Sequence, residues 1–118
     1  MAGFTIKRRH ELERTGKWLL ARRSLGLRAF GMNIVELAPG ESIPEHDETE
    51  RDHEEVFLVV EGTATMLIDG QPHEASAGTL VRLDPEPRRT AVNRGEERVT
   101  LLIVSAPRGS GYEPLSWA

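Results

Sequence analysis

The sequence predicts an all-β protein, an antiparallel sandwich or barrel that forms a single domain over residues 1–118. Short apolar runs with alternating side chains recur along the chain, turn residues separate them, and almost no stretch has helical periodicity. A chain of 118 residues can bury one hydrophobic core but not two. No linker or low-complexity tract divides it.

Residues 1–28 are predicted to form an N-terminal arm. Residues 4–6 make a short β-like run, and residues 11–15 are interpreted as one helical turn. Residues 18–27 are interpreted as a strand with a break at Gly26. This segment either packs into the core, or lies at a sheet edge or against a second subunit.

The remaining strands are predicted from apolar runs bounded by turn residues: 29–37, 55–60, 63–68, 71–75, 79–83, 88–93 and 98–106. Strand 55–60 carries apolar residues on both faces, so we expect it to be covered on both sides. Asp69-Gly70 predicts a two-residue hairpin turn. The tail is loop-like, but Tyr112, Leu115 and Trp117 predict that it docks.

Composition narrows the function classes. A formal net charge of -4 gives no field that would gather nucleic acid or anionic lipid, so neither nucleic acid nor a membrane is an expected partner. The absence of cysteine excludes disulfides, thiolate metal sites and a cysteine nucleophile. No run resembles a membrane span or a signal peptide, and the expected location is cytoplasmic.

The candidate chemistry lies in a stretch that begins at Gly40 and ends at Gly62. Five residues separate Gly40 from His46, and six separate Glu55 from Gly62. This spacing resembles the first motif of the cupin superfamily: glycine, five residues, His-x-His, a short gap, glutamate, six residues, glycine. Residues 78–93 keep the length and the two end residues of the second cupin motif.

The resemblance covers residues 40–93 and implies a double-stranded β-helix, or jelly-roll, barrel that is commonly dimeric. It also implies an interior metal, held by two histidines and the glutamate of the first motif and by the histidine of the second. The chain keeps His46 and Glu55 at their places. Glu48 stands where the second histidine belongs, and Arg89 stands where the last one belongs.

These departures leave alternatives open. His53 lies two residues before Glu55, so a strand would point both side chains to one face, and His53 can replace the missing ligand. Arg89 has no lone pair to offer a metal. The reduced set His46, His53 and Glu55, with or without Glu48, suits iron, manganese, nickel or zinc. Alternatively, Arg89 neutralises Glu55 or Glu48, or binds a substrate carboxylate through a two-pronged hydrogen bond.

Three functions follow. Arg89 in place of a histidine favours a barrel that binds a small molecule, anionic if Arg89 contacts it, in a pocket of His46, Glu48, Glu55 and Arg89. The alternative is a metal-dependent enzyme of dioxygenase, isomerase or decarboxylase type that uses His46, His53 and Glu55. The third is a structural or regulatory interaction module whose barrel is simply filled. Apart from these functions, the acidic loop of residues 45–55 can be a solvated loop without a site. The resemblance and the apolar side chains of the N-terminal arm predict a homodimer.

Overall fold

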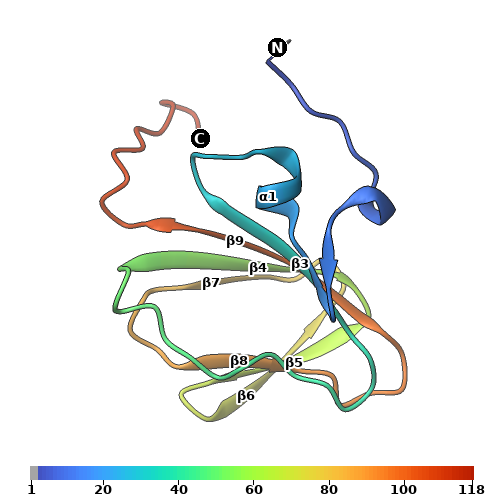
Figure 1. Ribbon diagram of the computed structural model, residues 1–118. Helices are drawn as coiled ribbons and strands as arrows, with labels where there is room; N and C mark the ends of the chain where they lie inside the picture. Colours follow the sequence, from blue (N-terminus) through green and yellow to red (C-terminus); the bar gives the residue numbers. More distant parts are fainter. Residues whose placement is uncertain (1–2) are drawn as a thin grey trace.

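A computed structural model describes residues 3–118 as two antiparallel sheets that face each other (Figure 1). The six-stranded sheet has the order β1-β2-β3-β9-β4-β7, and the three-stranded sheet has the order β6-β5-β8. The bounds are Arg14–Thr15 (β1), Trp18–Leu19 (β2), Gly31–Leu37 (β3), His53–Glu61 (β4), Thr63–Ile68 (β5), Gln71–Ser76 (β6), Leu80–Leu83 (β7), Arg89–Val92 (β8) and Val99–Pro107 (β9). Strands far apart in the chain pair with each other, as in a jelly roll, so the predicted all-β class is confirmed.

The predicted strands after residue 28 are all present, with ends that differ by a few residues. The hairpin between β5 and β6 is confirmed, because Asp69 and Gly70 have φ angles of 48° and 78° and Ile68 pairs with Gln71. Positive φ at both central residues is what a two-residue turn between right-twisted strands requires.

Within the single chain, β4 is not covered on both sides as the sequence predicted. Glu55, Phe57 and Val59 are buried on its inner face, whereas Val60 is 44% exposed on the other. The three-stranded sheet lies against the inner face only, and helix α1, Ala21–Leu25, packs against β3 instead of β4. Apolar residues on both faces of a strand therefore do not predict that the same chain covers both faces.

The N-terminal segment differs from its prediction, because residues 18–27 do not form one interrupted strand. Only β2 is extended, and α1 follows at once and ends at Gly26, whose φ of 70° is a left-handed helix cap. Residues 22–25 lack alternation and include two arginines, which favour a helix. Leu19 and Ala21 are buried, as the core-packing alternative predicted.

The chain ends also differ from expectation. A 3₁₀ turn spans Arg9–Glu11 rather than residues 11–15, and residues 4–6 form no strand. The tail does not dock on its own chain: Trp117 is 82% exposed, and Tyr112 and Leu115 are exposed as well. Both ends extend on the outer side of the six-stranded sheet (Figure 1), away from the core that would bury them. Residues 1–2 of the predicted arm lie outside the described residues.

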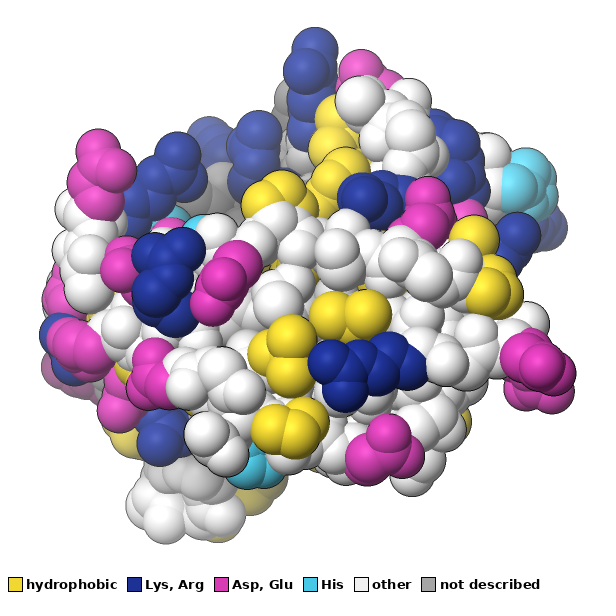
Figure 2. All heavy atoms as spheres, turned by 90° about the horizontal axis from the view of Figure 1, so that it is seen from below, with side chains coloured by type: hydrophobic (Ala, Val, Ile, Leu, Met, Phe, Trp, Pro, Cys, Tyr) yellow, Lys and Arg dark blue, Asp and Glu magenta, His cyan; other side chains and the backbone are white. Residues whose placement is uncertain are grey.

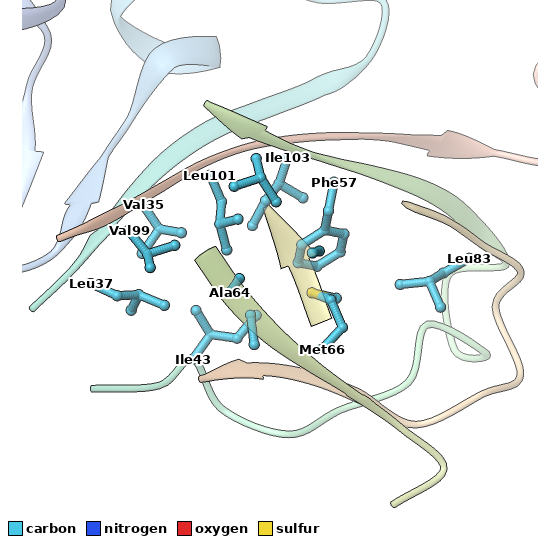
Figure 3. Packing of buried hydrophobic residues seen from close by; sticks show 13 residues of the cluster. Val35, Leu37, Ile43, Phe57, Ala64, Met66, Leu83, Val99, Leu101 and Ile103 are labelled. Carbon is cyan, nitrogen blue, oxygen red and sulfur yellow. The ribbon is translucent and has the colours of Figure 1, made fainter. Parts of the chain in front are cut away.

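The hydrophobic core lies between the two sheets (Figure 3). Phe57 and Met66 meet in it from opposite sheets, beside Ile103. On the outer side of the three-stranded sheet, acidic and basic side chains are interspersed (Figure 2). Within residues 3–118 we find no helix with the length and apolar character to cross a bilayer.

The last residue of the second motif has a structural role. Asn93 is fully buried, and its Nδ2 donates to the carbonyl oxygens of Leu37 at 2.9 Å and Glu97 at 2.7 Å. Its Oδ1 accepts from the Gly95 amide at 3.0 Å. These bonds tie the loop after β8 to the end of β3.

Candidate functional site

Backbone pairing positions His46. The segment before β4 forms an isolated bridge to β8, in which the His46 amide donates to the Arg89 carbonyl at 3.0 Å and the Arg89 amide donates to the His46 carbonyl at 2.8 Å. The His46 ring has Nδ1 2.9 Å from the Pro44 carbonyl oxygen. Since a carbonyl accepts only, Nδ1 carries the hydrogen, and Nε2 of the neutral ring keeps a free lone pair.

Two carboxylates converge on that Nε2 atom. Glu48 Oε1 lies 3.3 Å from it and Glu55 Oε1 lies 3.7 Å from it. The three donor atoms all lie within 4.8 Å of one another. Glu55 projects from the inner face of β4, and Glu48 is held in the preceding loop, where its amide donates to the Pro85 carbonyl at 2.9 Å. Two donors from the loop before β4 and one from β4 itself therefore lie around one point.

The electrostatics of this point favour a cation. Burial raises the pKa of Glu55, and the neighbouring Glu48 carboxylate adds to the rise, while Arg89 and His46 act against it. Ionised Glu55 therefore costs free energy in the folded protein. A cation held between the two carboxylates offsets that cost.

Arg89 does not face a ligand, and its predicted two-pronged contact with a substrate carboxylate is wrong. The side chain is 0% exposed and does not line the cavity. Its guanidinium donates to three backbone carbonyls, of Asp84 and Pro87 at 2.5 Å and of Pro85 at 3.2 Å. Nε lies 3.3 Å from Glu55 Oε1, so the structure fits the other alternative, in which Arg89 partly neutralises Glu55.

The three converging side chains open into a cavity of about 500 Å³. Its size fits a small molecule. His53 begins β4 and lines the same cavity, but it is not in the group formed by His46, Glu48 and Glu55. The apolar side chains of Phe57 and Ile103 also line the cavity.

Sequence reasoning missed three arginines in the lining, Arg22, Arg28 and Arg51. Arg51 lies between Glu48 and Glu55, inside the first motif, and that position was a usable signal. Arg22 and Arg28 belong to the N-terminal arm and follow no motif, so only the packing of α1 against β3 shows that they reach the cavity.

Comparison with known proteins agrees with this architecture. The family model described as "Cupin domain" matches residues 33–105, more than half of the chain. Among curated proteins, no significant match was found. Solved structures with the same fold are numerous.

Three solved structures illustrate the likeness. A cupin protein from Bacteroides fragilis is 22% identical, covers 99% of this chain and 94% of its own, and superposes with a TM-score of 0.81. A sugar phosphate isomerase from a cupin superfamily, from Silicibacter pomeroyi, is 22% identical over 82% of this chain and 72% of its own, with a TM-score of 0.70. A predicted oxalate decarboxylase from Thermotoga maritima is 18% identical over 87% and 99%, with a TM-score of 0.72.

At these identities the structures establish the fold, and the family model establishes the membership. The two motifs, the paired sheets and the inward His46 and Glu55 agree with both. The chain belongs to the cupin superfamily.

Proposed function

We propose that this cupin holds a divalent metal ion through His46, Glu48 and Glu55 and binds a small molecule beside it in the cavity. The observation that carries the proposal is the convergence of one imidazole Nε2 and two carboxylates on one point. One nitrogen and several carboxylate oxygens suit iron, manganese, nickel or zinc. The bond from His46 Nδ1 to the Pro44 carbonyl is the outer contact that orients a metal-binding histidine.

In this proposal each residue has a defined task. His46 and Glu48 present their donor atoms from the loop before β4, and buried Arg89 keeps Glu55 aimed at the same point. When bound, the metal supplies a Lewis acid that binds and polarises an oxygen of the small molecule.

If the protein is an enzyme, the proposal names only the type of reaction, isomerisation or decarboxylation, and no substrate. Two structural neighbours carry the names sugar phosphate isomerase and predicted oxalate decarboxylase, which fall within the isomerase and decarboxylase types of the enzyme alternative. Their low identity to this chain supports a shared fold and leaves the reaction to be measured.

A second candidate is a metal-free barrel that binds a small molecule. It is favoured by the Arg89 cation 3.3 Å from Glu55 Oε1, which supplies part of the positive charge that a metal would supply. In this version the raised pKa of Glu55, caused by its burial, favours the protonated carboxyl that needs no metal.

The metal content of untagged protein, purified without chelator, tests the proposal. We expect about one ion per chain in the wild type and nearly none in His46→Ala, because the imidazole is the only nitrogen donor of the group. His73→Ala is the matched control, since His73 is exposed on β6, outside the cavity lining, and its variant should keep the metal. A wild type that stays empty after incubation with each of the four metals contradicts the metal proposal and supports the metal-free candidate.

We also propose a homodimer formed over the outer face of the six-stranded sheet. Ile34, Leu102, Leu58 and Leu80 stand side by side across four strands of that face. The two chain ends, which carry exposed apolar residues, extend on the same side of the molecule (Figure 1). An aliphatic face of this kind is typical of an interface between copies.

The dimer is tested by light scattering at micromolar concentration. Leu80→Asp should shift the mass from dimer to monomer, because Leu80 is 68% exposed in the single chain and its replacement would place a charge in the interface. Gln71→Asp, on the three-stranded sheet, should leave the dimer intact. A wild type of monomeric mass removes this proposal.

A cytoplasmic location, and the absence of nucleic-acid and membrane partners, stay predictions from composition and charge.

A further inference from the structure

The arginines of the cavity differ from almost all others in the chain. Among residues 3–118, most arginines have a carboxylate oxygen within 4.0 Å. The exceptions are Arg22, Arg28, Arg51 and Arg94, and the first three all line the cavity. Three cations without carboxylate partners therefore share one cavity.

Local structure presents these arginines from two segments. Arg22 lies on α1 and Arg28 follows it, and the left-handed cap at Gly26 folds the chain back so that the Leu27 amide donates to the Arg22 carbonyl at 2.9 Å. Arg22 Nη1 in turn reaches the Leu27 carbonyl at 3.4 Å. This turn brings Leu27, the residue before Arg28, back to Arg22.

Arg51 comes from the loop before β4. Its acidic neighbour Asp52 is already engaged, because Asp52 Oδ1 accepts from Arg108 at 2.6 Å and 3.0 Å. Arg108 is also bonded to Glu86 at 2.9 Å, which anchors the loop to the connector before β8. Asp52 is thus engaged by another arginine, and Glu50, the acid on the other side of Arg51, has no carboxylate oxygen within 4.0 Å of the Arg51 guanidinium.

The cavity lining carries charges of both signs. Glu48 and Glu55 gather around His46, whereas Arg22, Arg28 and Arg51 bring three positive charges to the same lining. Three guanidiniums in one cavity repel one another unless an anion lies between them. A phosphate ester carries up to two negative charges and several acceptor oxygens, which match planar guanidinium donors better than a single carboxylate does.

We propose that Arg22, Arg28 and Arg51 form the subsite for the phosphate group of a small phosphorylated molecule. The subsite deepens the proposed function. It rests on that function in one respect: the other end of the ligand is taken to direct an oxygen at His46, Glu48 and Glu55. Apolar lining residues, among them Trp18, Phe30 and Met32, provide contacts for the carbon body of such a molecule.

The test is calorimetric titration with glycerol 3-phosphate and with inorganic phosphate, at constant ionic strength set by chloride. The protein is first stripped of metal with a chelator that is then dialysed away. The wild type should bind both probes, and the triple variant Arg22→Gln, Arg28→Gln, Arg51→Gln should bind them at least about tenfold more weakly. Arg94→Gln is the matched control, because Arg94 also lacks a carboxylate partner but lies outside the cavity lining, and it should bind as the wild type does.

Acetate and malonate distinguish phosphate from carboxylate chemistry. Tighter binding of malonate than of glycerol 3-phosphate overturns the phosphate assignment. Absence of phosphate binding, equal binding by wild type and triple variant, or an equal loss in Arg94→Gln overturns the subsite. Each single arginine variant is titrated as well, so that a folding defect of the triple variant does not decide the result.

The outcomes separate this inference from the metal proposal. Arginine-dependent phosphate binding by a protein that takes up no metal supports the subsite and contradicts the metal proposal. Metal uptake that depends on His46, without any arginine-dependent phosphate binding, supports the metal proposal and contradicts the subsite.

Discussion

Arg89→Met is expected to lower the free energy of unfolding by about 3–5 kcal/mol, because it removes one partner of a buried ion pair. Glu55 would keep its buried carboxylate without the adjacent cation. The carbonyls of Asp84, Pro85 and Pro87 would also lose their guanidinium donors. Urea denaturation of metal-free protein, followed by far-ultraviolet circular dichroism, measures the loss.

The neighbouring Arg88→Met serves as the control. Arg88 is exposed and its ion pairs are on the surface, so its loss should cost only about 0–1 kcal/mol. The double variant Arg89→Met, Glu55→Gln should recover part of the stability, since no unpaired carboxylate remains. Equal losses for Arg88→Met and Arg89→Met would show that the buried pair has no special role.

Gly62→Ala is expected to destabilise the protein by at least about 3 kcal/mol, through backbone strain and overpacking combined. Gly62 has a φ of 76°, which disfavours a side chain, and a Cβ there would clash with the backbone carbonyl oxygen of Arg98. Arg98 directly precedes β9, and its backbone cannot move aside as a flexible side chain can. The turn from β4 into β5 would have to open.

Gly40→Ala is the matched control at the other end of the same motif. Its φ of 84° is similar, but a Cβ there meets no atom within 4 Å, so only the conformational cost of about 1–2 kcal/mol applies. Thermal and urea unfolding of the two variants should therefore differ clearly. Similar losses would mean that the approach of Arg98 to Gly62 does not constrain the turn.

Local sequence was sufficient for the strands and turns. The alternation in β3, β4 and β9 and the Asp69-Gly70 turn depend on the conformational preferences of neighbouring residues, which a single chain displays directly. Local sequence was insufficient to predict helix α1 or to show that no other layer of the chain covers the outer face of β4. Both depend on which distant segment packs against them, and alternation does not report that.

The candidate site divides in the same way. The sequence by itself determined the all-β class, the membership implied by the motif spacing, and the placement of His46 and Glu55 together. Only the tertiary structure decided that Glu48 joins them, because that depends on the path of the loop before β4 and its bonds to Pro85 and β8.

The tertiary structure also decided the role of each cation. The connector before β8 encloses Arg89 with three carbonyls and withdraws it from the cavity, whereas α1 and the loop before β4 bring Arg22, Arg28 and Arg51 to the lining. Spacing along the chain fixes which face of a strand a residue takes, since side chains alternate locally. It does not fix which distant backbone accepts the hydrogen bonds of a long side chain, since that requires the packed structure.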